Sequence, residues 1–127
     1  MRQKIGSISL LVRDYDETIS FYTNKLHFNL VEDTDLGGGK RWVLVAPPGS
    51  AETCLLLAKA ISPAQESRIG DQTGGRVFLF LHTDDFWRDY QDMKSNGVNF
   101  LEEREPKLMA LSPSLRISTE TSGICWN

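Results

Sequence analysis

The sequence predicts an α+β fold in which one strand–helix–strand pattern occurs twice. Two observations support this fold class. The chain has 127 residues, which is enough for a single domain with its own hydrophobic core. Its two halves also resemble each other, because a shift of 71 positions places Val12 on Thr83 and Asp14 on Asp85. We therefore expect two copies of one unit, neither of which can bury its sheet alone.

The first copy begins with a strand and a capped helix. Ile8–Val12 is a short apolar run, as is typical of a strand. Asp14 follows it at an N-cap position, and Glu17 stands at the third helical position, as in a capping box. Apolar residues at helical spacing extend the helix to about Leu26. His27 stands at the helix exit, which predicts either a left-handed residue or a different exit.

Three strands complete the first copy. We expect them at residues 28–34, 41–46 and 53–58. The three glycines at 37–39 permit a hairpin between the first two strands, and a proline and glycine turn at 47–50 follows the second.

A linker separates the two copies and contains Pro63, Gly70, Gly74 and Gly75 among polar residues. We expect one short helical turn in it, near residues 63–68. The single domain then consists of a first module at about 4–60, a linker at 61–76 and a second module at 77–127.

The second copy repeats the order of the first. A strand is expected at 77–83, a helix at 86–96 and another strand at 98–101, with Asp84 and Asp85 at the helix cap and Gly97 after its C-cap. Beyond the helix the matching shift falls to 70 positions, with Phe28 on Val98 and Glu32 on Glu102. The second helix is therefore expected to be one residue shorter.

The composition excludes several classes of protein. The net charge is −3, and no basic cluster is larger than Lys40 and Arg41, so we expect no nucleic-acid partner. The apolar runs are far shorter than the ~20 residues of a spanning helix, so we expect no membrane partner. No signal peptide is visible, which favours a cytoplasmic protein. The two cysteines and two histidines lie too far apart for a zinc finger or a disulfide scaffold.

Several motifs in the first copy carry a resemblance to a known family. The runs 8–17, 21–22 and 25–28 resemble the opening module of the glyoxalase, bleomycin-resistance and extradiol-dioxygenase superfamily, also called vicinal oxygen chelate proteins. The runs 37–42 and 46–49 resemble a small uncharacterised branch of it, and the likeness covers about residues 4–103. The resemblance implies two βαβββ modules that form a curled mixed sheet around a ligand cavity, a homodimer, and a divalent metal in many enzymes.

The metal ligands of such relatives have poor equivalents in this chain. The positions seven residues before the two aligned aspartates are Ser7 and Phe78, and neither is a useful ligand for a divalent ion. The expected fourth strand of the first copy holds no carboxylate to supply the third ligand. We therefore expect no metal and no other cofactor, with a substitute site built on Cys54 or His82 as the alternative.

Strand alternation indicates which side chains face the cavity. Ser7, Ser9 and Leu11 share one face of the first strand. This lining is typical of a small-molecule pocket, so we predict that Ser7 and Ser9 bind the ligand.

The second copy supplies an equivalent face, made of Phe78, Phe80 and His82. We predict that all three contact the ligand, although each aromatic residue is also compatible with ordinary core packing. His82 is the candidate general acid or base, because histidine is the residue type that changes charge near neutral pH. Trp42, which follows Lys40 and Arg41, is predicted to stack on a planar or cationic ligand, with core or dimer packing as the alternative.

These residues lead to three functional hypotheses. The first is a protein that binds a small organic molecule in a cavity, without the family's metal site. The second is a metal-dependent lyase or dioxygenase of the same superfamily. The third is a resistance protein that sequesters an antibiotic.

The end of the chain, 108–127, differs in composition from the rest. Only Arg116 and Glu120 are charged there, and the strand, Tyr-Gly-Asn turn and final strand implied by the resemblance are missing. Reading each codon one base earlier from Leu108 permits YGTVAVFEDLYGNLWDLLE, which contains those elements. We therefore hypothesise a shifted reading frame, and expect the second module to be altered from about Glu103. The alternative is a divergent tail with strands near 108–111, 114–118 and 123–126.

Overall fold

The structure is a computed structural model that describes residues 1–50, 52–74, 76, 78–100, 114–117 and 123–126. It contains two compact units, Met1–Ile69 and Gly70–Asn127, and their boundary falls within the predicted linker. Each unit has a four-stranded mixed sheet, which is combined with several helical segments in the first unit and with one helix in the described part of the second, so the predicted α+β class is confirmed. No helix among the described residues is both long and apolar enough to span a membrane.

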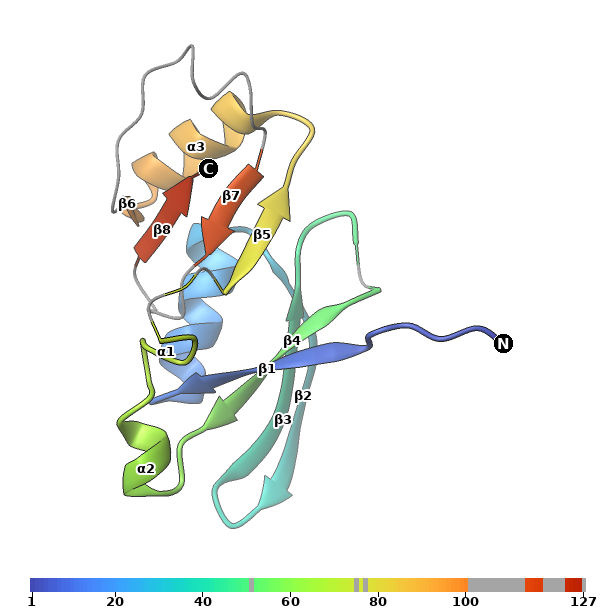
Figure 1. Ribbon diagram of the computed structural model, residues 1–127, viewed down its shortest axis with the longest axis vertical. Coiled ribbons are helices and arrows are strands. Elements are labelled where there is room, and N and C mark those ends of the chain that lie inside the picture. Colours follow the sequence, from blue (N-terminus) through green and yellow to red (C-terminus); the bar gives the residue numbers. More distant parts are fainter. Residues whose placement is uncertain (51, 75, 77, 101–113, 118–122, 127) are drawn as a thin grey trace. The chain divides into compact units, whose positions relative to one another are not determined.

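The first unit is a complete βαβββ module (Figure 1). Its strands are β1 (Ser7–Val12), β2 (Asn29–Gly37), β3 (Lys40–Ala46) and β4 (Cys54–Lys59), in the spatial order β1-β4-β3-β2. β1 pairs with β4 in parallel, and the other neighbours are antiparallel. The short helix α2 (Pro63–Glu66) follows β4 where a helical turn was predicted.

The helical segment of the first unit begins and ends about where it was predicted, but its last part is not an α-helix. α1 (Tyr15–Ser20) is capped by Asp14, whose carboxylate accepts a 2.8 Å hydrogen bond from the Glu17 backbone N–H. It continues as a π-helical turn, η1 (Phe21–Lys25), rather than as an α-helix to Leu26. His27 then has φ 60°, the left-handed conformation that was one of its two predicted outcomes.

The core of the first unit lies between its sheet and α1 with η1. Alternate residues of the strands are fully buried there, among them Leu10, Val12, Val43, Val45 and Leu57. Tyr22 packs against the rings of Phe21 and Phe28 at centroid distances of 5.4 and 5.2 Å. Burial of Tyr22 raises the pKa of its phenol well above the usual range, because a phenolate has no water there.

The second unit starts in the same way as the first. β5 (Leu79–His82) leads to α3 (Phe86–Ser95), and the N-cap carboxylate of Asp85 accepts a 3.1 Å hydrogen bond from the Arg88 N–H. Gly97 follows the helix with φ 86°, as predicted from its sequence position. The two helical segments also differ in length as predicted, because α1 and η1 together are one residue longer than α3.

The sheet of the second unit does not repeat the order of the first. Its other strands are β6 (Asn99–Phe100), β7 (Ser114–Ile117) and β8 (Gly123–Trp126), in the spatial order β5-β7-β8-β6. β5 therefore has an antiparallel neighbour, and the parallel pair is β6 with β8. Strands lie at two of the three positions expected for a divergent tail, and the third, 108–111, is outside the described residues.

Candidate functional site

The first unit has a sheet face turned away from α1, which we call the Trp42 face. The pairing register places residues of all four strands on it: Ser7, Ser9 and Leu11 of β1, Cys54, Leu56 and Ala58 of β4, Trp42, Leu44 and Ala46 of β3, and Asn29, Glu32 and Thr34 of β2. The residues between them face α1. The predicted grouping of Ser7 and Ser9 with Leu11 agrees with this register, and Trp42 lies on the same face.

One row crosses the whole Trp42 face. Ser9 pairs with Leu56, Leu56 with Leu44, and Leu44 with Glu32. Opposed residues of neighbouring strands bring their side chains to about 5 Å. The row therefore runs from a hydroxyl across two half-buried leucines to a carboxylate.

Trp42 lies in the adjoining row, where it pairs with Thr34. Its relative exposure is 38%, which is high for an indole and leaves the ring accessible to another aromatic group. The Thr34 hydroxyl donates a 3.3 Å hydrogen bond to the Glu32 carboxylate. Trp42, Thr34 and Glu32 thus place an aromatic surface beside polar atoms on one face.

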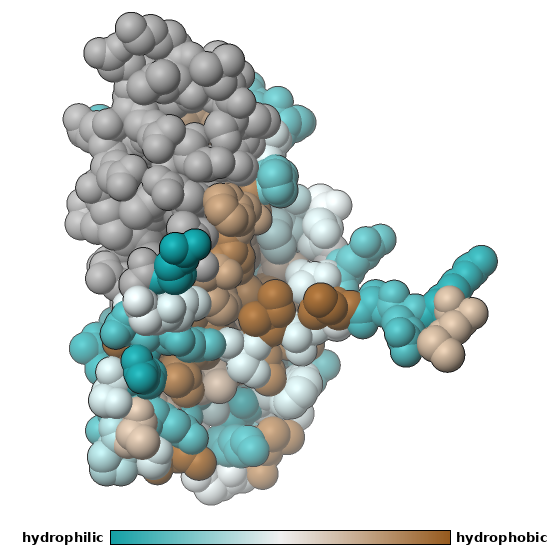
Figure 2. Space-filling view, viewed as in Figure 1, coloured by the Kyte–Doolittle hydropathy of each residue, from teal (hydrophilic) through white to brown (hydrophobic). Residues whose placement is uncertain are grey.

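Other hydrophobic side chains reach the surface of the same unit. Figure 2 shows them along β1. Ile5 is 67% exposed and Ile8 is 38% exposed. The exposed apolar surface is therefore larger than the Trp42 face.

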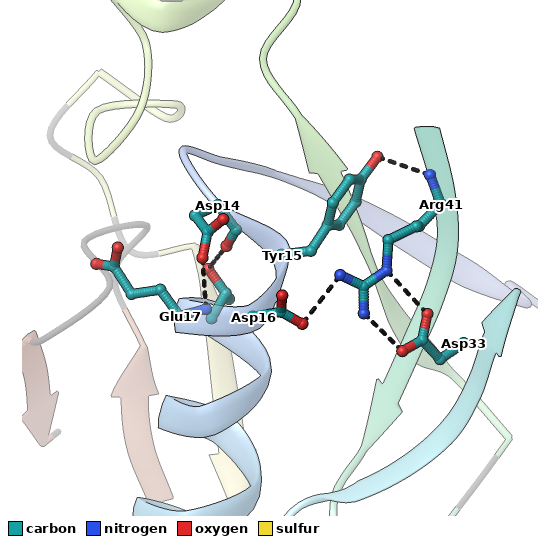
Figure 3. A network of polar contacts seen from close by, with 7 residues as sticks. Asp14, Tyr15, Asp16, Glu17, Asp33 and Arg41 are labelled. Carbon is teal, nitrogen blue, oxygen red and sulfur yellow. Dashed lines mark hydrogen bonds and ion pairs between the residues drawn. The ribbon is translucent and has the colours of Figure 1, made fainter. Parts of the chain in front are cut away.

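A polar network behind the sheet holds the hairpin that carries Trp42 (Figure 3). The Arg41 guanidinium donates two hydrogen bonds to Asp33, at 3.1 and 2.6 Å, and one to Asp16 at 2.9 Å. Its Cζ lies 5.2 Å from the ring centroid of Tyr15, and its backbone N–H donates to the Tyr15 hydroxyl at 3.2 Å. These contacts connect the start of α1 to β2 and β3.

The charges of this network shift each other's ionisation. Hydrogen bonding to Arg41 lowers the pKa of Asp33, and the bonds from Asp33 and Asp16 raise the pKa of Arg41. Since Arg41 and Trp42 are neighbours on opposite faces of β3, the network fixes the strand segment from which the indole projects.

The second unit presents part of its predicted ligand set. Phe80 is 51% exposed and His82 is also exposed, whereas the intervening Leu81 is half-buried. The alternation thus agrees with the predicted shared face of Phe80 and His82, and their contact with a ligand stays a prediction. Phe78 differs, because β5 begins at Leu79 and Phe78 lies one residue before the strand, half-buried.

The residues at the family's metal positions do not fit a divalent ion. Ser7 is exposed beside the buried thiol of Cys54, and β4 carries no carboxylate. Within the described part of the chain, no three His, Cys, Asp or Glu side chains gather closely enough to hold a metal. The donor chemistry at Ser7 and Phe78 therefore gives no basis for a metal-dependent step.

The contribution of β2 to the Trp42 face was not predicted from the sequence. Leu30 pairs with Val45, and Glu32 pairs with Leu44, which is adjacent to Val45. Two steps along β2 thus match one step along β3, so β2 has a bulge at Val31. The bulge sends Leu30 and Glu32 to opposite faces, although strict alternation would place them together.

The fold and the Trp42 face define a class of small α+β protein with a βαβββ module and an accessible, largely apolar sheet face. The model of the Glyoxalase/Bleomycin resistance protein/Dioxygenase superfamily matches residues 4–120. The chain belongs to that superfamily, as its motifs indicated.

Individual relatives are similar at two levels. An uncharacterized protein of Shewanella frigidimarina (strain NCIMB 400) is 58% identical over 102 residues, which cover 80% of this chain and 76% of that protein. The crystal structure of UcmS2 is similar with a TM-score of 0.73 at 22% identity, over 98% of this chain and 96% of that one. TnmS3, described as an antibiotic binding protein from Streptomyces sp. CB03234, has a TM-score of 0.67 at 23% identity, over 98% and 93%.

Proposed function

We propose that this protein binds a small organic molecule with a planar apolar part, on the Trp42 face and without a metal ion. The observation that carries the proposal is the accessible indole of Trp42 beside the row from Ser9 to Glu32. Ligand pockets combine a mainly apolar lining with a few polar groups that fix orientation. Leu44 and Leu56 supply the apolar part, and the hydroxyl and carboxylate supply the polar edges.

The chemistry of this face favours binding over catalysis. Glu32 accepts a hydrogen bond from Thr34 and is available to accept others from a hydroxyl or a cationic group of the ligand. In the second unit, Phe80 and His82 are proposed as ligand-contacting residues of that unit's own sheet face. His82 remains the candidate acid or base if a reaction takes place, since histidine is the side chain that most often transfers protons in catalysis. The proposal includes a homodimer, as the family resemblance implies, in a cytoplasmic setting.

A specific ligand class is favoured by one of the similar structures. TnmS3 is described as an antibiotic binding protein, and binding by stacking and hydrogen bonds needs no metal. We therefore propose an antibiotic with an aromatic part as the second, narrower candidate.

Fluorescence titration tests the proposal. Bleomycin and a set of hydroxylated planar aromatic compounds serve as probes; tryptophan emission is the readout for the parent, and titration calorimetry gives the affinities of the parent and the variants. We expect quenching by at least one planar probe, with Trp42→Ala weakening its affinity by about tenfold because a stacked aromatic anchor is lost. Leu36→Ala is the matched control, since Leu36 is 52% exposed at the hairpin end, outside the row. Equal affinity in the Trp42→Ala variant and the parent would exclude this face as the site.

Metal analysis tests the other half of the proposal. We expect less than stoichiometric metal after purification and unchanged probe binding after treatment with a chelator. Tightly held Ni, Zn, Fe or Mn at one ion per chain would instead favour the lyase or dioxygenase hypothesis.

A further inference from the structure

We infer that residues 108–127 are translated in a different reading frame from the rest of the coding sequence. The tail that the original frame would encode is called the in-phase tail. The first observation is the interrupted repeat within the fold. The two units agree through a strand, an Asp cap, a helix and the start of a second strand, and they then differ in sheet order. The difference arises from β7 and β8, which both lie after Leu108.

Comparison with the first unit shows which strand pairing the second sheet lacks. In the first unit β1 pairs in parallel with the last strand, β4, from Ser7–Cys54 to Val12–Lys59. β5 is the counterpart of β1, and it pairs antiparallel with β7 instead. An exchange of the second and third positions of the sheet would restore the order of the first unit.

The neighbouring reading frame can encode the missing elements. When each codon starts one base earlier, Met109 into Ala110 forces Gly, and Trp126 into Asn127 forces Glu. Synonymous choices at the other steps permit YGTVAVFEDLYGNLWDLLE. Its VAVF run corresponds to Val43–Ala46 (VLVA) of β3, its Gly-Asn supplies a turn, and NLWDLLE supplies a final strand.

The composition of the tail and the incomplete extent of one match agree with a change of reading frame. Only Arg116 and Glu120 are charged between Leu108 and Asn127. The match to the Shewanella frigidimarina protein covers 80% of this chain and 76% of that protein, so both chains keep an unmatched part. A change of reading frame would leave the end of each chain without a match in the other. The family match, in contrast, continues to residue 120. The codons of the gene therefore decide between a changed reading frame and a divergent tail.

The in-phase tail would also change the proposed ligand surface of the second unit. The final strand would pair with β5 as β4 pairs with β1. Its Asp would face away from α3, because an unpaired carboxylate is costly among apolar side chains. That is the face of Phe80 and His82, so the restored sheet would place a carboxylate among these candidate ligand residues.

Sequencing the coding DNA is the first test. The Val-Phe-Glu-Asp of the in-phase tail requires Ser114, Leu115 and Arg116 to be encoded by TCT, TTG and AGG, although each residue has several synonymous codons. We expect these three codons, and no stop codon in the neighbouring phase from Leu108 onward. A stop codon there, or a translation that lacks the strand–turn–strand pattern, would overturn the inference.

The protein itself provides the second test. The full chain with YGTVAVFEDLYGNLWDLLE in place of residues 108–126 is compared with the present chain and with a variant that carries the same residues in scrambled order. We expect the in-phase chain to melt about 5–10 °C higher, and the amide exchange of Leu79–His82 to slow at least about tenfold. A melting temperature equal to or below that of the scrambled control would overturn the inference. Neither readout depends on ligand binding, so the proposed function fails or holds separately.

Discussion

The two units of this protein share their beginnings and differ in their sheets. In both, a strand is followed by an N-cap aspartate, Asp14 or Asp85, and the helix that follows ends near a left-handed residue, His27 or Gly97. The first sheet has the order β1-β4-β3-β2 and the second β5-β7-β8-β6. Local signals are thus enough to repeat the first half of the unit, whereas the sheet order depends on segments far along the chain.

The one-residue difference between the helices has a structural counterpart. The longer helical segment ends in the π-helical turn Phe21–Lys25, and the shorter one, α3, is an α-helix throughout. A π turn closes i→i+5 hydrogen bonds and so accommodates an extra residue without lengthening the helix by a full rise. The first unit therefore accommodates the additional residue within its helical segment.

Truncation of one symmetry-related leucine in each unit should have the largest effect. Leu10 of β1 is 1% exposed, and its counterpart Leu81 of β5 is half-buried. We expect Leu10→Ala to lower the free energy of unfolding by about 3 kcal/mol, through lost burial and a cavity, and Leu81→Ala by less than about 1.5 kcal/mol. Urea denaturation followed by circular dichroism measures both. Equal losses would mean that the second sheet is packed as well as the first.

The contrast also explains how far the sequence predicted the structure. The caps, helices and glycine turns follow from a few adjacent residues, so Asp14, Asp85 and Gly97 lie where their patterns placed them. The π turn and the bulge at Val31 came from the packing of whole elements, which no short pattern encodes. Glu32 was missed for that reason, because its face depends on the bulge.

The left-handed residues after the two helices should respond in opposite directions. His27 has φ 60° and Gly97 has φ 86°. A side chain in this region is strained, so Gly97→Ala should cost about 1–2 kcal/mol, while His27→Gly should gain about 0.5 kcal/mol after the added flexibility of the unfolded chain is counted. Thermal unfolding of the two variants checks the signs. A loss in the His27→Gly variant would show that contacts of the imidazole outweigh the backbone strain.

The N-cap aspartates should behave alike. Asp14 accepts from Glu17 N–H at 2.8 Å and Asp85 from Arg88 N–H at 3.1 Å. Replacing either by Ala should cost about 1 kcal/mol, and replacing either by Asn should cost much less, because the amide oxygen still caps the helix. Circular dichroism during chemical denaturation gives both values. A much smaller cost for Asp85→Ala would show that α3 does not unfold cooperatively with the first unit.

The two arginine networks should give the smallest and most pH-dependent difference. The Arg41 side chain is 25% exposed between Asp16 and Asp33, whereas the Arg88 side chain is 58% exposed beside Asp84 and Asp89. Because exposed ion pairs contribute little, we expect Arg41→Gln to lower the melting temperature by a few degrees and Arg88→Gln by about 1 °C or less.

The pH dependence of the Arg41 effect follows from Asp33. Hydrogen bonding to Arg41 lowers the pKa of Asp33 in the folded protein, so this stabilisation is present above the unfolded pKa of about 3.9 and is lost as the pH falls further. The melting temperatures of the parent and the Arg41→Gln variant should therefore differ at pH 7 and converge below about pH 4. A difference that persists at low pH would assign the effect to the contact of Arg41 with the Tyr15 ring. In that case the hairpin bearing Trp42 would be held by packing, and its position would be insensitive to acid.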